Sequence, residues 1–187
     1  MKISLPFTTT PELTGRPDKE KRVYDFMEKN NIPLFGLDHE PAATMEICAL
    51  IEEKLGASIC KNLFLCNAQA TSFYLLLMPG NKAFKTKFLS KQINSSRLSF
   101  SSPENMEKYL DILPGSVSIM GLMNDKENAV KLIIDRELLK LDEIGIHPCV
   151  NTSTLKISTK DLLKKIIPAL GREPVFVDLP DPAKEAE

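Results

Sequence analysis

Two apolar runs separated by a short polar segment constrain the fold more than any other feature of the sequence. Residues 58–66 read SICKNLFLC, residues 72–78 read SFYLLLM, and NAQAT lies between them. Short runs rich in Leu, Ile and Phe on either side of such a segment indicate a β-hairpin. Because the second run is apolar from Phe73 to Met78, we expect its strand to be buried on both faces of the sheet.

Helices and strands interleave irregularly around this hairpin. Pro17, Thr44 and Ser102 are suited to helix starts, and Gly56 and Gly171 to helix ends. The patterns predict helices at 16–31, 44–55, 85–93, 101–113 and 161–170, and further strands at 32–39, 96–100, 129–136, 145–151 and 154–158. Since a sustained βαβ rhythm is missing, we expect an α+β domain with a mixed, curved, barrel-like sheet flanked by helices.

The length and composition suit one globular domain. The chain has 187 residues, of which 43% are hydrophobic and 26% charged, and a chain of this size can bury a sizeable core. Residues 1–15 are rich in Pro and Thr and are expected to be irregular. We expect the folded body at 16–171 and a Pro-rich, acidic tail at 172–187.

The charges are unevenly distributed along the chain, although the net charge is only -1. Between Glu53 and Glu104 there is no acidic residue, and the basic residues in this stretch are Lys54, Lys61, Lys82, Lys85, Lys87, Lys91 and Arg97. A locally positive surface can attract a polyanion such as RNA. It can equally be a solvated face balanced by acidic residues from the rest of the fold.

The four cysteines, at positions 48, 60, 66 and 149, form neither a CxxC pair nor a zinc-ligand pattern. No secretory signal opens the chain, and no apolar run approaches the roughly 18 residues of a membrane span. We therefore expect a reduced, cytoplasmic protein that needs no metal or other cofactor.

Lys61 is the first candidate functional residue. Strand alternation places it on one face with Ile59, Leu63 and Leu65. It can guard a strand edge, or cover Leu63 with its stem while its ammonium stays in water. Alternatively, it can provide a fixed positive charge in a pocket that holds a phosphate or a developing oxyanion.

His147 and the loop from Gly115 to Asn124 are the other candidates. His147 lies in GIHPCVN, where Pro148 favours an extended backbone, and His39 is the second histidine of the chain. Either histidine can be structural or catalytic. Cys149 lies two residues after His147, a spacing that does not give the thiol-to-base hydrogen bond of a cysteine hydrolase. The loop has glycines whose backbone can approach a ligand closely, but no nucleotide-binding motif.

In combination and order, these segments resemble the YbaK/prolyl-tRNA editing family, of the free-standing alanyl-tRNA(Pro) deacylase type. The segments are CKNLFL, FYLLLMPG, LPGSVSIMGLMND, VKLIIDREL and GIHPCVNTSTLKISTKDLLK, within a resemblance that runs from about Arg16 to Pro174. The resemblance implies a mixed, curved sheet with a pocket for the 3′ end of misacylated tRNA(Pro). It leaves open whether the protein acts alone or with prolyl-tRNA synthetase.

The resemblance also implies roles for individual residues. Lys61 would contact the terminal phosphate, the Gly115 backbone would meet the aminoacyl end, and His147 would complete the catalytic set. The ribose 2′-hydroxyl would assist the attack, so neither a protein nucleophile nor a metal would be required. The substrate-binding residues implied are Asn62, Ser116 and Asn151.

The chain departs from the family pattern in one place. The family loop commonly reads Ser-Pro-Phe where this sequence has Ser118, Ile119 and Met120. A flexible Met can change the size of a pocket, so hydrolysis of Cys-tRNA(Pro) is the alternative to hydrolysis of Ala-tRNA(Pro). A non-catalytic module that binds tRNA or a synthetase, and a regulatory binder of small molecules, are alternatives of other classes.

Overall fold

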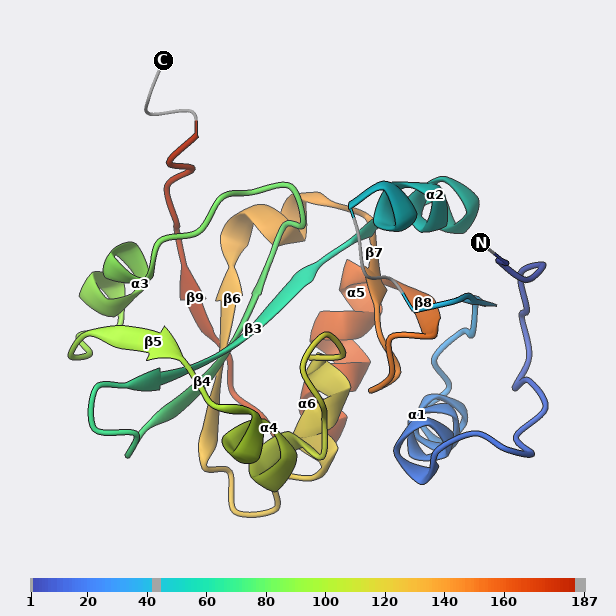
Figure 1. Ribbon diagram of the computed structural model, residues 1–187, viewed down its shortest axis with the longest axis horizontal. Helices are drawn as coiled ribbons and strands as arrows, with labels where there is room; N and C mark the ends of the chain where they lie inside the picture. The colour runs from blue at the N-terminus through green and yellow to red at the C-terminus, as the bar shows by residue number, and fades with distance from the viewer. Residues whose placement is uncertain (1, 42–44, 184–187) are drawn as a thin grey trace.

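The computed structural model describes residues 2–41 and 45–183 and has the expected α+β fold (Figure 1). Its helical elements are α1 (Asp18–Lys29), α2 (Met45–Leu55), α3 (Thr86–Gln92), α4 (Pro103–Leu110), η1 (Ile119–Met123), η2 (Arg136–Lys140), α5 (Thr159–Asp161), η3 (Leu162–Ile166) and α6 (Ile167–Ala169). Its strands are β1 (Gly36–Asp38), β2 (Ser58–Ile59), β3 (Lys61–Asn67), β4 (Phe73–Met78), β5 (Leu98–Phe100), β6 (Val130–Asp135), β7 (Glu143–Ile146), β8 (Ser153–Ser158) and β9 (Val175–Val177).

Within the described residues, the strands form two mixed sheets. The strand order is β1-β8-β7-β2 in the first sheet and β5-β3-β4-β6-β9 in the second. The run at 58–66, which the sequence predicts as one strand, is divided at Cys60 between the two sheets. The division arises because β2 pairs in parallel with β7, whereas β3 pairs with β4.

The predicted hairpin is confirmed. Strands β3 and β4 are antiparallel from the pair Lys61 and Met78 to the pair Cys66 and Phe73. Every residue of β4 is buried, as its apolar sequence predicts. One face of β4 packs into the main core between the sheets, which also contains Leu162 and Ile166 of η3.

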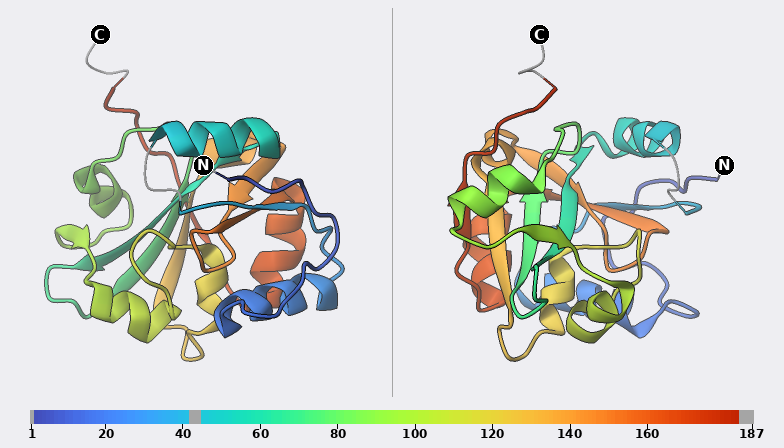
Figure 2. Two further views of the ribbon diagram at one scale, coloured as in Figure 1. Left: turned by 45° about the vertical axis from the view of Figure 1, so that its right-hand side comes forward. Right: turned by 60° about the vertical axis from the view of Figure 1, so that its left-hand side comes forward.

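The opposite face of the five-stranded sheet carries a smaller core. Leu65 of β3 and Leu76 of β4 pack there with Leu89 of α3. Helix α3 and the continuous helical stretch from α5 to α6 therefore cover opposite faces of this sheet, as Figure 2 shows in its left view. Successive side chains along β3 consequently point alternately to the main core and to the smaller core.

The helix ends follow the signals in the sequence. Helix α1 begins directly after Pro17, and Ser102 caps α4 by accepting a hydrogen bond from the amide of Asn105. Gly56 and Gly171, which follow helix ends, adopt left-handed φ angles of +69° and +65°. The predicted cap at Thr44 lies outside the described residues.

The two terminal segments contribute more structure than the sequence predicts. Ile3 and Phe7 form isolated bridges with His39 and Gly36, and in the tail β9 extends the five-stranded sheet by pairing with β6. The three apolar residues of β9 lie among proline and acidic residues, which hides the strand signal. None of the helices within the described residues is long and apolar enough to cross a membrane.

A buried ion pair fastens the start of the tail to the end of η1. The Arg172 guanidinium donates to Asp125 Oδ2 at 3.0 Å and to the carbonyl of Leu122 at 3.0 Å. The same carboxylate accepts from the amides of Ala129 and Val130. This cluster holds the chain between η1 and β6 in place.

Candidate functional site

The junction between the two sheets brings Lys61 close to the segment of His147. In the parallel pair of β2 and β7, Ile59 lies opposite Gly145, and the Cys60 amide donates to the Gly145 carbonyl at 3.0 Å. Neighbouring strands are about 4.8 Å apart, and Lys61 and His147 each lie two residues beyond this pair. Both residues therefore leave the same end of the parallel pair.

Lys61 lies on the face of β3 that carries α3. Its half-buried side chain donates from Nζ to the carbonyl of Lys82 at 2.7 Å. An ammonium has three donors, so this bond leaves up to two for a ligand. The ammonium points to the loop after β4. That Lys61 lines one pocket together with His147 and Gly115 stays a prediction.

The loop that accepts this hydrogen bond is held rigidly. A Cβ at Gly80 would lie 2.1 Å from the carbonyl oxygen of Ile59, so only glycine fits there. The buried Lys82 ammonium contacts Asp135 at 2.7 Å and also pairs with Glu137. Burial alone lowers the pKa of Lys82, but hydrogen bonds to these two carboxylates raise it overall.

Asn62 points to the other face of β3, toward the main core. Its Nδ2 lies 3.3 Å from both the carbonyl oxygen and the Sγ of Cys60. Its Oδ1 is buried and has no hydrogen-bond partner within the described residues. A buried acceptor without a partner needs an explanation, and a ligand that donates a hydrogen bond would supply one.

The predicted loop at Gly115 lies against Asn151. Gly115 has a left-handed φ of +87°, and a Cβ built on it would lie 3.6 Å from Asn151 Nδ2. The next residue, Ser116, is buried, and its amide donates to the Leu113 carbonyl. Two of the distant segments singled out in the sequence, around Gly115 and Asn151, therefore meet.

The second half of this loop differs from its prediction as an irregular segment, because 119–123 forms the 3-10 helix η1. Ile119 and Met120 are fully buried in the main core. Ile119 and Met120, where the sequence departs from the family pattern, can therefore change the shape of the loop only through their packing in the core.

His147 and His39 are connected through the hydroxyl of Thr154. His147 Nδ1 lies 3.1 Å from the Ser153 carbonyl oxygen and 3.4 Å from Thr154 Oγ1. His39 Nε2 lies 2.8 Å from the same hydroxyl, and its Nδ1 lies 2.8 Å from the Glu40 carbonyl oxygen. The two rings have centroids 6.5 Å apart.

One assignment of histidine tautomers and of the Thr154 hydroxyl proton satisfies all four hydrogen bonds. Carbonyl oxygens only accept, so Nδ1 carries the proton in both histidines. Thr154 then donates to His39 Nε2 and accepts from His147 Nδ1. In this arrangement Nε2 of His147 is an acceptor that can take a proton from a hydroxyl or water. The link between the two histidines runs through Thr154 of β8, a residue that the sequence does not single out.

Both histidines are neutral near pH 7. Burial is the main cause that lowers the pKa of His39 and of His147 from the ordinary value of 6.5, and His39 lowers that of His147 further. A neutral imidazole is required for His147 Nε2 to accept a proton.

We expect the fold to lose stability in mild acid because of this pair. A lowered folded-state pKa means that the unfolded chain binds protons more readily, so the stabilisation is complete above pH 6.5 and is lost as the pH falls below it. Urea unfolding at about pH 7.5 and about pH 5.5 measures the loss. His39→Gln and His147→Gln should each reduce it, and equal losses in wild type and variants would contradict the assignment.

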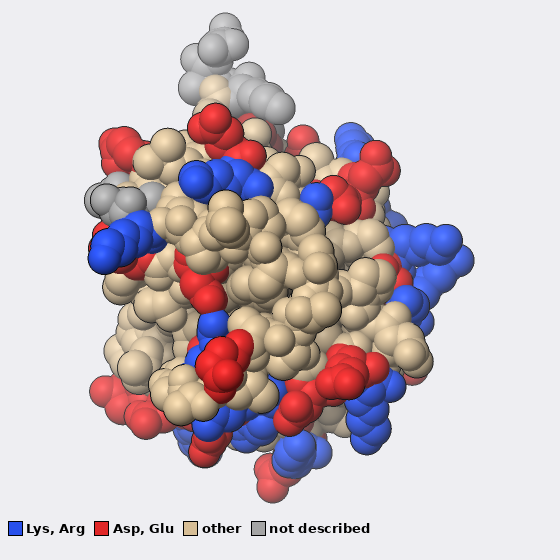
Figure 3. Space-filling view, turned by 90° about the vertical axis from the view of Figure 1, so that its right-hand side faces the viewer, with Lys and Arg blue, Asp and Glu red and all other residues tan. Residues whose placement is uncertain are grey.

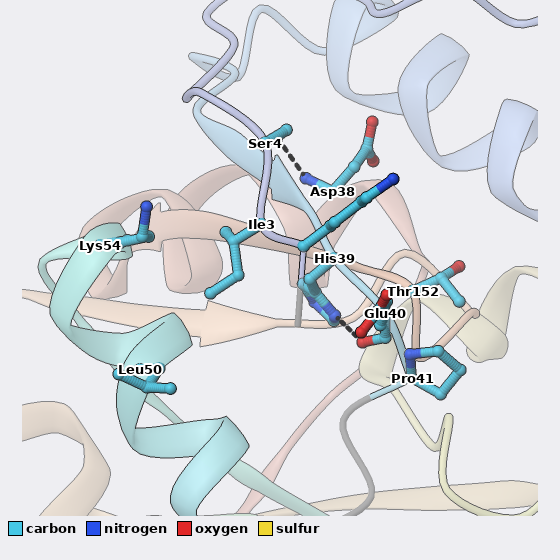
Figure 4. Close-up of a pocket in the computed structure, with 10 residues that line it drawn as sticks. Ile3, Ser4, Asp38, His39, Glu40, Pro41, Leu50, Lys54 and Thr152 are labelled. Carbon is cyan, nitrogen blue, oxygen red and sulfur yellow. Dashed lines mark hydrogen bonds between the residues drawn. The ribbon is translucent and has the colours of Figure 1, made fainter.

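A large open pocket borders His39. It has a volume of about 950 Å³, and its lining includes Ile3, His39, Leu50, Lys54 and Thr152. Figure 4 shows Ile3 and His39 on one side and Leu50 and Lys54, from α2, on the other. Lys61, Gly115 and His147 are not among its described lining residues, and the pocket is linked to His147 through His39 and the Thr154 hydroxyl.

The face of the molecule that carries the N-terminal segment and α2 has a middle area with few charged side chains. Lys, Arg, Asp and Glu gather around this area (Figure 3). Such a surface can receive an uncharged group at its centre and charged groups at its rim.

Cys149 does not serve as a nucleophile. The strand predicted at 145–151 is wrong beyond its start, because β7 ends at Ile146 and Cys149 has a left-handed φ of +64°. Its thiol is buried, and burial raises its pKa to about 12. The thiolate that a cysteine hydrolase needs is therefore absent near pH 7, in agreement with the rejection of that class from the sequence.

The class of this protein follows from a match to a family across a range that contains these residues. Residues 39–165 match the family described as the aminoacyl-tRNA editing domain. This range contains Lys61, Gly115 and His147 and covers more than half of the chain. The chain therefore belongs to the aminoacyl-tRNA editing domain family.

Particular relatives refine this result. The chain is 31% identical over 154 residues to the "Prolyl-tRNA editing protein ProX" of Acetoanaerobium sticklandii, across 82% of this chain and 93% of the relative. It is 26% identical to "Prolyl-tRNA synthetase associated domain-containing protein 1" of Danio rerio, across 79% and 80% of the two chains.

The fold also resembles solved structures. One is the crystal structure of a candidate trans-editing enzyme for prolyl-tRNA synthetase, with a TM-score of 0.64 and 18% identity, covering 88% of this chain and 99% of that one. A likeness at this identity supports the α+β editing fold.

Proposed function

We propose that this protein is a trans-editing deacylase that hydrolyses the ester of mischarged Ala-tRNA(Pro). The observation that carries the proposal is the sheet junction, where Lys61 and Asn62 start one sheet beside the segment of His147 in the other. The relative named as a prolyl-tRNA editing protein, which aligns over most of both chains, supports tRNA(Pro) as the substrate.

The residues divide the binding of the substrate between them. The Lys61 ammonium, held by the Lys82 carbonyl, offers its remaining donors to the phosphate of the terminal nucleotide. The buried Oδ1 of Asn62 accepts from a substrate hydroxyl or ammonium. The backbone at Gly115, beside Asn151, approaches the aminoacyl end, where an amide donor stabilises the developing oxyanion.

In the reaction itself, a water oxygen bonds to the ester carbonyl carbon and the bond to the ribose oxygen breaks. The ribose 2′-hydroxyl assists the attack, and the proton released by water ends on the leaving ribose oxygen. His147 Nε2 accepts a hydrogen bond from the reacting hydroxyl or water. None of these steps requires a protein nucleophile.

The test is deacylation of tRNA(Pro) charged separately with Ala, Cys and Pro. We expect fast hydrolysis of Ala-tRNA(Pro) and little hydrolysis of Pro-tRNA(Pro), because a pocket shaped for a small side chain excludes a larger one. Hydrolysis of none of the three above the rate without protein would overturn the proposal. Faster hydrolysis of Cys-tRNA(Pro) would support the alternative substrate.

A non-catalytic module that binds tRNA or a synthetase is the second candidate. Ile119 and Met120, which replace the usual loop residues and are fully buried, are the observation that favours it. Salt-sensitive tRNA binding without hydrolysis of any misacylated tRNA would identify this case.

Three further expectations belong to this proposal. Residues 16–171 form the editing unit, within which the family match at 39–165 lies. We expect prolyl-tRNA synthetase as a partner, because one relative is named after this synthetase and another after prolyl-tRNA. The cytoplasm is the expected location, because tRNA is charged there.

A further inference from the structure

A groove lies between α3 and β5, away from the residues assigned above. It has a volume of about 630 Å³, and its lining includes Phe84, Lys85, Lys87, Ser90, Arg97 and Phe100. Strand β5 is the edge strand of the five-stranded sheet. The groove therefore opens along one edge of the fold.

The charge of the groove is entirely positive. Lys85, Lys87 and Arg97 are exposed, and none of them forms an ion pair within the part of the chain that the structure describes. All three belong to the stretch between Glu53 and Glu104 that has no acidic residue. Acidic residues folded over this stretch, the alternative left open by the sequence, do not line the groove.

An exposed aromatic ring lies among these cations. The side chain of Phe100 is 61% exposed, and its ring meets the ring of Phe84 edge to face, with centroids 6.5 Å apart. A ring face in water beside several cations is typical of sites where bases of single-stranded nucleic acid stack.

The groove lies on the same face of the five-stranded sheet as Lys61. Phe100 lies directly opposite Leu65 in the antiparallel pair of β3 and β5, so both side chains point to one face. Lys61 points to this face as well, four residues along β3 from Leu65. At 3.3 Å per residue this separation is about 13 Å, which a few nucleotides can span.

We propose that the groove binds the single-stranded end of the tRNA, next to the nucleotide whose phosphate Lys61 contacts. Phe100 stacks under a base, and Lys85, Lys87 and Arg97 contact backbone phosphates. The combination of a ring and cations favours RNA over an acidic peptide, which has no base to stack. The identity of this RNA rests on the proposed function.

The experiment measures binding of uncharged tRNA(Pro), and of a short single-stranded RNA that ends in CCA, by fluorescence anisotropy across a range of salt concentrations. Phe100→Ala should weaken binding roughly 5- to 150-fold, the equivalent of about 1–3 kcal/mol for one stacked base. Phe100→Tyr should restore it. Lys87→Ala should lower the slope of log affinity against log salt by about 0.7.

Lys126→Ala is the matched control, because Lys126 is an exposed lysine outside the groove. It should leave the affinity for the short RNA unchanged. Thermal unfolding of each variant checks the fold, which an exposed side chain should not affect. Wild-type affinity and salt slope in both Phe100→Ala and Lys87→Ala would overturn the proposal, and so would equal competition by polyglutamate and RNA.

The outcome separates this inference from the proposed function. Binding of uncharged RNA requires no hydrolysis, so weakened binding in Phe100→Ala supports the groove even if no misacylated tRNA is hydrolysed. Conversely, fast hydrolysis of Ala-tRNA(Pro) with an unchanged KM and unchanged RNA binding in Phe100→Ala would reject the groove alone. When both proposals hold, Phe100→Ala raises KM and leaves kcat near the wild-type value.

Discussion

Lys61→Met is expected to lower kcat/KM for deacylation of Ala-tRNA(Pro) by about 100- to 1000-fold. The substitution keeps the apolar stem beside Leu63 and removes the ammonium that is held by the Lys82 carbonyl. Removal of one fixed hydrogen-bond donor from a site shielded from water, where it faces a phosphate or a developing oxyanion, typically lowers the rate by this factor. Rates with saturating and limiting substrate, measured on the same charged tRNA, give the ratio.

The control for this prediction is Lys126→Met, which removes an exposed lysine from another surface. It should leave kcat/KM within about twofold of wild type. A Lys61→Met variant as active as this control would remove Lys61 from the mechanism. Lys61 would then only protect the strand edge, or cover Leu63 with its stem while its ammonium stays in water. Lys61→Arg should recover little activity, because a planar fork does not replace a compact point charge in a confined position.

Asp125→Ala is expected to destabilise the fold by about 3–5 kcal/mol. The substitution leaves the buried Arg172 guanidinium without its carboxylate and leaves the amides of Ala129 and Val130 without an acceptor. Breaking a buried pair from one side typically has this effect, because an uncompensated charge remains in the interior. Urea unfolding at neutral pH provides the free energy of unfolding.

An exposed pair offers the matched control for Asp125. Asp178 lies 3.4 Å from Arg136, and both side chains are mostly exposed, so Asp178→Ala should change the free energy of unfolding by less than about 1 kcal/mol. An Asp125→Ala variant no less stable than Asp178→Ala would contradict the structural role of the buried pair. Replacing both Asp125 and Arg172 by apolar residues should recover part of the loss.

The sequence predicted the elements whose signals are local. The β3–β4 hairpin followed from the apolar residues Phe73–Met78, and the start of α4 followed from Ser102 and Pro103. The position of Lys61 among apolar neighbours of its strand also indicates a candidate functional residue from the sequence alone. Signals of this kind depend on a few adjacent residues.

Features that depend on distant pairing could not be predicted in this way. Nothing near Cys60 indicates that the chain changes sheets there, because the change is set by pairing with β7. The link from His39 through Thr154 to His147 requires the pairing of β1 with β8 and of β7 with β8. For the same reason, only the folded chain reveals that Asn62 Oδ1 is buried and has no hydrogen-bond partner among the residues that the structure describes.

The passage of the chain between the sheets at Cys60 has a mechanical consequence. One continuous peptide leads from β2 to β3 with a single residue between them, so the two sheets cannot slide past each other without moving the backbone of Lys61. The main core contains residues of both sheets, and the Cys60 amide is bonded to the Gly145 carbonyl, so a change in the angle between the sheets would also repack that core. The backbone position of Lys61 is thus coupled to the packing between the two sheets.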